Sequence, residues 1–380
     1  MRVALACLSS LFRTLYHMLA GLLYDDEPAA TAMRTASPDR FDALPCQMLK
    51  GAQRKPCSSW TMEVAIPARS LPTPAAFQVS RGLSVGRLLA RGAFARVYEC
   101  RDGTGEACVL KILVCDRALY DFKREVKLMG EMQPCPHVIG CKSGLVAVAE
   151  PESGVVRPAI VLEDGGTCLQ DLIERHVDAL ESAKAFATTT PPKASVLTEK
   201  IKVNLLQQMV YGVQHLHVVV GVCHRDLKPE NMTVDAAGVL RLVDFGLARF
   251  LDEGEANDGV FKEAVGTKPF AAPEVLREEL YDGRIADAWS LGVTAFALFF
   301  HFLPVEVAVW NLDWRFRAMS KYQVERSPHP LNTVAYILGW YKRENQVAMT
   351  SHRVVKFIDA LLVVEPSSRS RVRFSTLVGA

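Results

Sequence analysis

The chain of 380 residues is 49% hydrophobic and carries a formal net charge of +2 at pH 7. A chain of this length can bury a large core, and its balanced charge gives no bulk attraction that would favour nucleic acid as a partner. The ten cysteines are scattered singly, which excludes a disulfide-rich scaffold and indicates reduced thiols. No apolar run reaches the length of about 18 residues that a membrane-spanning helix needs, so we expect no transmembrane segment.

The first 80 residues are predicted to form a disordered tail ahead of the folded domain. Residues 1–24 begin with Arg2 and an apolar stretch that Arg13 interrupts, which favours an amphipathic helix or leader over a signal peptide. We therefore expect a cytoplasmic, intracellular protein, with secretion as the alternative if residues 1–20 act as a signal peptide. Residues 25–80 are rich in Ala, Pro, Ser and Thr, and such a composition cannot offset the entropy cost of ordering.

Residues 83–163 have the pattern of a small β-rich lobe. Short runs of alternating apolar and polar residues, separated by turns that contain Gly, are typical of an antiparallel meander. A helix is predicted where Phe122, Val126 and Met129 fall on one face. The expected strands cover residues 84–89, 96–101, 108–114, 145–149 and 158–163, and the expected helix covers residues 120–132.

Beyond residue 164 the sequence becomes mainly helical. Residues 201–220 and 287–303 form long apolar stretches, and the second is apolar nearly all round, which predicts a buried helix. Residues 175–200 are predicted to form an insertion between two helices, and residues 304–350 lack a familiar helical pattern. Each region could bind a partner, but a solvated loop is the favoured interpretation. The predicted fold class is therefore α+β with two lobes, and a ligand site between them is expected.

Residues 222–250 hold polar side chains at the ends of short apolar runs. Asp226, Asn231 and Asp244 offer the oxygen donors that Mg²⁺ prefers, usually together with substrate phosphates. Small residues around Gly92 would let backbone N–H groups approach those phosphates. Lys111 lies in an apolar run and needs an anionic partner, which Glu125 can supply from the next helix.

Four motifs, in this order and spacing, identify a family resemblance. They are "HRDLKPEN" at 224–231, "DFG" at 244–246, "APE" at 272–274 and "DAWSLG" at 287–292. The chain resembles a eukaryotic protein kinase of the Ser/Thr type from about residue 83 to 369. The resemblance implies a kinase domain over 83–380, divided into an N-lobe at 83–163, a hinge at 163–166 and a C-lobe at 167–380.

The resemblance also implies a role for individual residues. Asp226 would be the catalytic base, Lys228 would steady the γ-phosphate, and Lys111, anchored by Glu125, would hold the ATP phosphates. Asn231 and Asp244 would bind Mg²⁺. Leu162 would be the gatekeeper, and the nucleotide-binding residues would be Ala90, Gly92, Ala95, Val97, Val109, Lys111, Glu163, Gly165 and Thr233. Structural roles are implied for Asp287, which would brace the catalytic loop, and for a buried ion pair between Glu274 and Arg369.

The chain departs from the family pattern in its nucleotide pocket. Ala90 and Ala95 stand where glycines are usual, and alanine disfavours positive φ, which predicts a weakened approach to phosphate. Thr233 stands where an apolar residue usually lies beneath adenine, so a more polar pocket floor is expected.

The activation segment departs from the pattern as well. No Ser, Thr or Tyr lies between Gly246 and Gly266, so phosphorylation has no acceptor there. We expect Glu263, four residues before Thr267, to pair with Arg225 as a permanent and weaker substitute for phosphate. The alternative is that Glu263 only belongs to a solvated acidic loop.

The sequence is compatible with two classes of function. The first is a Ser/Thr protein kinase that uses ATP and Mg²⁺ on an unknown protein substrate, constitutively active if Glu263 replaces phosphate. The second is a pseudokinase or scaffold, which the altered Gly-rich loop would mark. Because Lys111, Glu125, Asp226, Asn231 and Asp244 are all present, activity is favoured. A small-molecule phosphotransferase should lack the "APE" and "DAWSLG" motifs.

Overall fold

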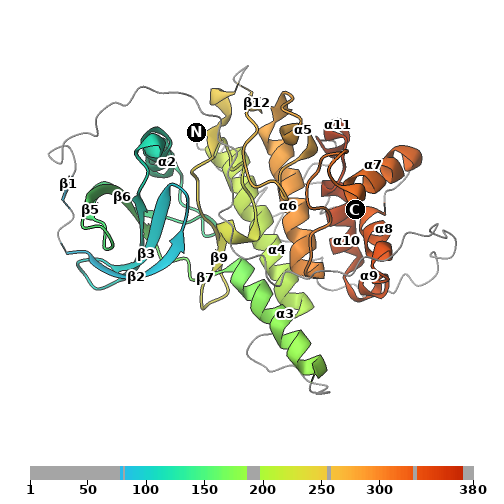
Figure 1. Cartoon of the computed structure of the whole chain (residues 1–380), viewed down its shortest axis with the longest axis horizontal. Coiled ribbons are helices and arrows are strands. Elements are labelled where there is room, and N and C mark those ends of the chain that lie inside the picture. The colour runs from blue at the N-terminus through green and yellow to red at the C-terminus, as the bar shows by residue number, and fades with distance from the viewer. Residues whose placement is uncertain (1–77, 80–81, 186–196, 255–257, 328–331, 371–380) are drawn as a thin grey trace, which may run out of the picture.

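The computed structural model describes residues 78–79, 82–185, 197–254, 258–327 and 332–370, which form two lobes side by side (Figure 1). One lobe is built on a β-sheet and the other is mainly helical, so the predicted α+β class is confirmed. The predicted tail lies outside the described residues except for Gln78–Val79. Within the described part of the chain, no helix combines the length and apolar character that crossing a membrane requires.

The small lobe contains a six-stranded sheet in the order β1-β5-β6-β4-β3-β2. All neighbouring strands are antiparallel except β1, which pairs in parallel with β5 and falls inside the segment assigned to the tail. Helix α2 packs against β5. The bounds are β1 (Gln78–Val79), β2 (Ser84–Arg91), β3 (Ala95–Arg101), β4 (Ala107–Leu113), η3 (Asp116–Ala118), α2 (Leu119–Glu131), β5 (Cys141–Ala149) and β6 (Val156–Glu163). The five strands and one helix predicted from residue 84 onward are thus confirmed, with ends that differ from the prediction by up to four residues.

Alternation along the strands gives this sheet two different faces. One face carries a separate apolar cluster that includes Tyr98, Leu110 and Ile112. The intervening position on β4, Lys111, points to the opposite face, where it meets Glu125 of α2. The sheet therefore places a lysine on the side that faces α2 and the large lobe.

The large lobe is built from helices joined by short strand pairs. The helices are α3 (Leu169–Ala185), α4 (Glu199–Gln214), η4 (His215–Val220), η5 (Pro229–Asn231), η6 (Leu251–Glu253), α5 (Pro273–Leu276), α6 (Gly283–Phe300), α7 (Trp314–Arg326), α8 (Thr333–Trp340), α9 (Asn345–Met349), α10 (His352–Leu361) and α11 (Pro366–Ser370). The strands are β7 (Thr167–Cys168), β8 (Val222–Cys223), β9 (Met232–Val234), β10 (Leu240–Leu242), β11 (Arg249–Phe250), β12 (Val260–Phe261) and β13 (Tyr281–Asp282). Of these strands, β8 and β9 flank the loop that carries Asp226 and Asn231.

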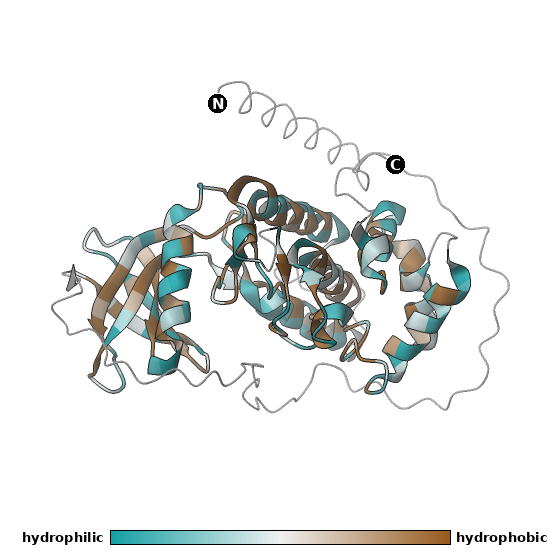
Figure 2. Cartoon of the chain, turned by 90° about the horizontal axis from the view of Figure 1, so that it is seen from above, coloured by the Kyte–Doolittle hydropathy of each residue, from teal (hydrophilic) through white to brown (hydrophobic). Residues whose placement is uncertain are grey.

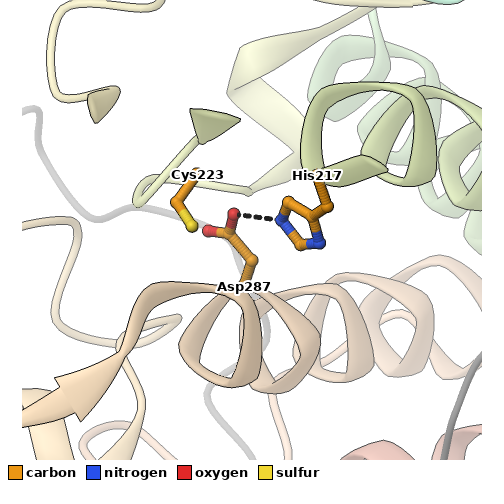
Figure 3. Close-up of side chains that lie close together, drawn as sticks. All are labelled: His217, Cys223 and Asp287. Atoms are coloured by element: carbon orange, nitrogen blue, oxygen red, sulfur yellow. Dashed lines mark hydrogen bonds and ion pairs between the residues drawn. The ribbon is translucent and has the colours of Figure 1, made fainter. Parts of the chain in front are cut away.

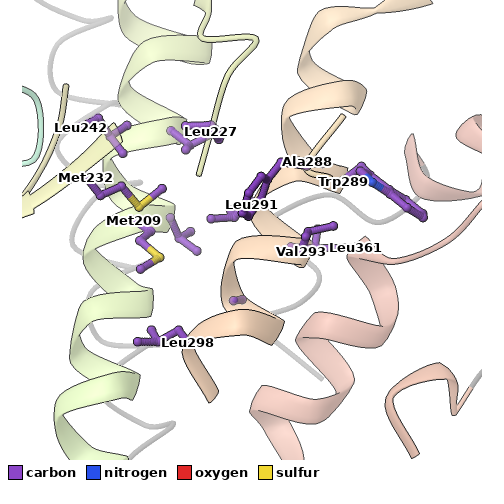
Figure 4. Packing of buried hydrophobic residues seen from close by; sticks show 14 of the residues in the cluster. Met209, Leu227, Met232, Leu242, Ala288, Trp289, Leu291, Val293, Leu298 and Leu361 are labelled. Atoms are coloured by element: carbon purple, nitrogen blue, oxygen red, sulfur yellow. The ribbon is translucent and has the colours of Figure 1, made fainter. Parts of the chain in front are cut away.

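Helix α6 is the centre of the large lobe, and its predicted burial is confirmed. Asp282 caps its first turn by accepting a hydrogen bond from the backbone of Arg284, and His301 ends it with φ 66°. Met209 of α4 and Leu298 of α6 belong to the same buried cluster, which continues across α6 to α10 (Figure 4). Figure 2 shows the hydrophobic ribbon concentrated in these inner helices and in the sheet, with hydrophilic stretches on the outer helices.

Several segments of the large lobe differ from the sequence prediction, and α6 itself begins four residues earlier and ends three residues earlier than the predicted 287–303. The apolar stretch 201–220 is not one regular helix, because α4 ends at Gln214 and a π-helical turn follows, terminated by Gly221 at φ 74°. The predicted insertion 175–200 is helical through Ala185, where amphipathic spacing continues α3, and residues 186–196 lie outside the described part. Most of the unfamiliar region 304–350 also forms helices, α7 to α9; α8 and α9 pack with α10, and α7 packs with α8.

Candidate active site

Lys111 of β4 is the centre of a charged cluster between the lobes. Its Nζ donates to both carboxylate oxygens of Glu125, at 2.6 and 2.8 Å, and to Oδ1 of Asp244 at 2.9 Å. The predicted contact between Lys111 and Glu125 is therefore present, and Asp244 joins it from the large lobe. Carboxylates from two segments distant in sequence thus contact one ammonium group.

The two carboxylates determine the charge state of this cluster. Burial by itself lowers the pKa of Lys111, but Asp244 and Glu125 outweigh it and raise the pKa above its ordinary value. The Lys111 ammonium in turn holds the pKa of Asp244 well below its usual range. Asp244 adopts φ 65°, a left-handed conformation that aims its side chain at the lysine, while the next residue, Phe245, is buried. The cluster therefore keeps an ionised lysine beside an ionised aspartate.

Asp226 lies at the centre of a second group of contacts, in the loop between β8 and η5. Lys228 Nζ donates to Asp226 Oδ2 at 2.8 Å, and Asn231 Nδ2 donates to the same oxygen at 2.9 Å. The other oxygen accepts from the backbone N–H and from the hydroxyl of Thr267, both at 2.8 Å. Asp226 is thus fixed on both oxygens, and Lys228 also contacts the Thr267 hydroxyl.

The predicted metal ligands Asn231 and Asp244 come from neighbouring segments. Val243 N donates to the carbonyl of Asn231 at 3.0 Å, so the residue that precedes Asp244 is tied to Asn231. Asn231 uses its side-chain nitrogen to bond Asp226, which leaves its amide oxygen as the atom suited to a cation. One amide oxygen and one ionised carboxylate are hard donors, and this set fits Mg²⁺ held together with substrate phosphates.

Asp287 of α6 holds the backbone of the Asp226 loop. Its carboxylate accepts from the N–H of His224 and of Arg225, both at 2.8 Å, and from Nε2 of His217 at 2.8 Å (Figure 3). Cys223 approaches the same carboxylate, and one donor atom from each of the three residues His217, Cys223 and Asp287 lies within 4.8 Å of the others. Because Asp287 is already fully engaged by donors and burial raises the pKa of Cys223 well above its ordinary value, we assign the group to bracing rather than to metal binding.

Arg225 and Glu263 form an ion pair between the catalytic loop and the activation segment. Arg225 Nη1 donates to Glu263 Oε2 at 2.6 Å, with the arginine side chain 1% exposed and the glutamate side chain 54% exposed. The Arg225 guanidinium lies 4.9 Å from the centroid of the Phe261 ring, and the Tyr281 hydroxyl donates to the carbonyl of Glu263 at 2.9 Å. The predicted contact is therefore present, and the Glu263 backbone is held as well.

The charge of Glu263 follows from three nearby arginines. Burial raises the pKa of its carboxyl, but Arg225, then Arg249 and Arg124, outweigh this and lower the pKa overall. Within the described residues, Nε and Nη2 of Arg225 are buried and have no hydrogen-bond partner. Glu263 is therefore ionised near neutral pH but neutralises only part of this basic cluster.

The predicted hinge lies against the predicted pocket floor. A Cβ on Gly165 would lie 2.2 Å from Thr233 Oγ1, so only glycine lets the hinge approach this side chain so closely. The Thr233 hydroxyl is buried and has no hydrogen-bond partner in the described part of the chain. Glu163 bonds Gly140 through both its backbone, at 3.0 Å, and its side chain, at 3.2 Å. A polar atom thus faces the hinge, as the sequence indicates.

The turn between β2 and β3 is closed by Gly92, whose N–H donates to the carbonyl of Ala95 at 2.8 Å. Residues 90, 92 and 95 are not among the described residues with positive φ. The backbone here needs no left-handed conformation, so the alanines are not strained by positive φ, and the weaker approach to phosphate stays a prediction.

Two valines predicted to bind the nucleotide lie on β3 and β4, the strands that follow the turn. Val97 pairs with Lys111 across β3 and β4, and Val109 pairs with the predicted gatekeeper Leu162 across β4 and β6. Cross-strand partners lie on the same face of a sheet, so Val97 shares the face of Lys111.

Two contacts of the site are missing from the sequence prediction. The bond between Thr267 and Asp226 joins residues 41 apart, and the bond between His217 and Asp287 joins residues 70 apart. His217 lies seven residues before His224, and no sequence pattern around it indicates a role. Its contact with Asp287 depends on where α6 packs.

A two-lobed fold with these two charged groups defines a site of the protein kinase class. A family model described as Protein kinase domain matches residues 83–375, and the chain belongs to this family. It is 35% identical over 271 residues to CBL-interacting protein kinase 16 of Oryza sativa subsp. japonica, covering 68% of this chain and 53% of that protein. It is 32% identical over 247 residues to CBL-interacting serine/threonine-protein kinase 20 of Arabidopsis thaliana, covering 63% and 49%. The chain spans about half the length of the curated relatives it matches.

Proposed function

We propose that the chain is an active Ser/Thr protein kinase that transfers the γ-phosphoryl group of ATP to a protein hydroxyl. The observation that carries this proposal is the geometry of Asp226, which accepts hydrogen bonds from Lys228, Asn231 and Thr267 within 2.9 Å. A base held on both oxygens is positioned before the substrate arrives, and positioning is the main contribution to catalysis of phosphoryl transfer.

In this reaction the bond between the γ-phosphorus and its bridging oxygen to the β-phosphate breaks, and a bond to the substrate hydroxyl oxygen forms. Asp226 orients that hydroxyl and accepts its proton, while Lys228 stabilises charge on the transferred group. Lys111 holds the α- and β-phosphates from the small lobe. Asn231 and Asp244 would hold Mg²⁺, which supplies neutralisation of the phosphate charge.

We further propose that Glu263 makes this activity constitutive. Its ion pair with Arg225 joins the activation segment to the catalytic loop, and the sequence supplies no phosphate acceptor between Gly246 and Gly266. A carboxylate carries one charge where a phosphate carries about −1.5 to −2, so the segment is held less firmly but without a switch.

The pseudokinase alternative rests on the alanines of the Gly-rich turn. Because Ala90 and Ala95 adopt no positive φ, this ground for lost catalysis is weak. The test is incubation of the purified chain with ATP, Mg²⁺ and a panel of generic protein substrates, read by phosphosite mass spectrometry. Phosphoserine or phosphothreonine should accumulate with time, whereas ATP binding without transfer would favour the pseudokinase.

A further inference from the structure

The turn between β2 and β3 is flanked by two arginines that lie directly opposite each other. Arg91 is the last residue of β2, Arg96 is the second residue of β3, and the two are paired in register. Like charges directly opposite in an antiparallel pair destabilise it. The end of the hairpin that carries Gly92 therefore needs negative charge from elsewhere in the fold to stay closed.

Two glutamates in the turn between β5 and β6 supply that charge. Arg91 Nη1 donates to Glu152 Oε2 at 3.0 Å, and Arg96 Nη1 lies 3.0 Å from the same oxygen. Arg96 also donates to Glu150, whose side chain is buried and is further contacted by Ser153. One carboxylate thus bridges the two opposed arginines, and a second, buried carboxylate anchors one of them.

These contacts lie on the face of the sheet opposite to Lys111 and α2. Successive residues of a strand point to opposite faces, so Arg96 points away from the face that Val97 shares with Lys111. Arg96 therefore lies on the same face as Tyr98 of the separate apolar cluster. The glutamates therefore hold the turn from outside and do not meet the nucleotide. The backbone supports the same closed position, because Val114 N donates to the carbonyl of Phe94 at 2.8 Å.

We propose that Glu150 and Glu152 are positioning residues that hold the turn of residues 91–95 in place over the nucleotide phosphates. The inference rests on the proposed function, since the turn covers phosphates only if the site binds ATP. Where the family places three glycines, this chain has Ala90, Gly92 and Ala95. Its turn is accordingly fixed by side-chain charge on the outer face of the sheet.

The test uses Glu152→Gln, because this side chain is partly exposed and its loss does not endanger the fold. Glu99→Gln is the matched control, since it breaks the exposed pair of Arg87 and Glu99 in the same hairpin, 2.6 Å long, away from the turn. Amide hydrogen exchange of residues 90–96 is measured without nucleotide, and kcat and KM for ATP are measured separately. Glu152→Arg, alone and combined with Arg91→Glu, tests whether an exchanged pair restores the contact.

We expect Glu152→Gln to speed exchange in residues 90–96 and to raise KM for ATP about three- to tenfold, with kcat changed by less than about twofold. Glu152→Arg should be worse, and adding Arg91→Glu should recover most of the loss, while Glu99→Gln moves neither quantity. Unchanged exchange in Glu152→Gln, or an equal effect of Glu99→Gln, would overturn the proposal. Exchange is decisive even if the wild-type chain transfers no phosphate, so failure of the kinase function and failure of this proposal are distinguishable.

Discussion

The hydroxyl of Thr267 donates a 2.8 Å hydrogen bond to Oδ1 of Asp226, and Lys228 contacts both side chains. A threonine of the activation segment is therefore part of the proposed catalytic group. Because its hydroxyl is bonded to the proposed base Asp226, we expect Thr267 to be a poor site for activating phosphorylation.

This contact predicts the behaviour of Thr267 variants. Thr267→Ser keeps a hydroxyl and should retain activity within about threefold, whereas Thr267→Ala should lose about tenfold or more because Asp226 is less well fixed. Thr267→Glu should also be inactive, since a second carboxylate would face Asp226. Steady-state kinetics on one substrate check the series, and a gain of activity in Thr267→Glu would show that the residue is a phosphorylation switch.

The pair of Arg225 and Glu263 predicts activity that needs no upstream kinase. Protein made in a host without protein kinases should be active and insensitive to phosphatase. Glu263→Ala and Arg225→Ala should each lower kcat, by about threefold or more for the glutamate, and the double variant should be no worse than the poorer single one. Asp252→Ala, which removes another acid of the segment, is the control; if Glu263→Ala matches it, Glu263 is only part of a solvated loop.

The buried cluster at the end of α6 predicts sensitivity to acid. Lys202 donates to the carbonyl of Phe299 at 3.2 Å and lies 2.8 Å from His301 Nε2. Burial, then the charges of Lys202, His176 and Arg343, lowers the pKa of His301 to about 3. Between pH 6.5 and 3 the unfolded chain therefore binds more protons at this residue than the native chain, so the stability present above pH 6.5 is lost as the pH falls.

The variant His301→Asn tests this dependence, because asparagine tolerates the left-handed conformation at φ 66°. Its free energy of unfolding should fall less between pH 7 and pH 5 than that of the wild type, by about 1 to 2 kcal/mol. Urea unfolding at several pH values measures the difference. Parallel pH curves for the two proteins would show that His301 does not contribute.

The ion pair of Glu274 and Arg369 predicts a large effect on stability. Arg369 donates to both oxygens of Glu274 at 2.8 Å, both side chains are buried, and the guanidinium lies 5.1 Å from the Trp289 ring centroid. Glu274→Ala leaves a buried charge without its partner and should cost about 3 to 5 kcal/mol of unfolding free energy. Denaturant unfolding checks this value, and a loss below about 1 kcal/mol would mean that the arginine is neutralised elsewhere.

The sequence predicted those strands and helices that depend only on the spacing of nearby residues. The alternation of the β2 to β4 strands, the spacing of α2 and the apolar surface of α6 appear where residues repeat with the period of a strand or helix. The contacts Lys111–Glu125, Arg225–Glu263 and Glu274–Arg369 were expected from motif resemblance and are present.

The remaining features depend on how distant segments meet. The bridging of Arg91 and Arg96 by Glu152 requires the β5–β6 turn to lie at the same end of the sheet as the β2–β3 turn. The absence of strain at Ala90 could not be predicted either, because the family pattern places a glycine there and only the backbone shows that no positive φ is used.

The variant Asp226→Asn tests whether Asp226 serves an active phosphoryl-transfer site. Asparagine has nearly the same shape but accepts no proton, so the fold and the binding of ATP with Mg²⁺ should be preserved. We expect the wild-type chain to phosphorylate Ser or Thr in a generic substrate and Asp226→Asn to lower kcat by about 10² to 10⁴. If the wild-type chain binds ATP but transfers no more phosphate than Asp226→Asn, Asp226 is not the base of an active kinase.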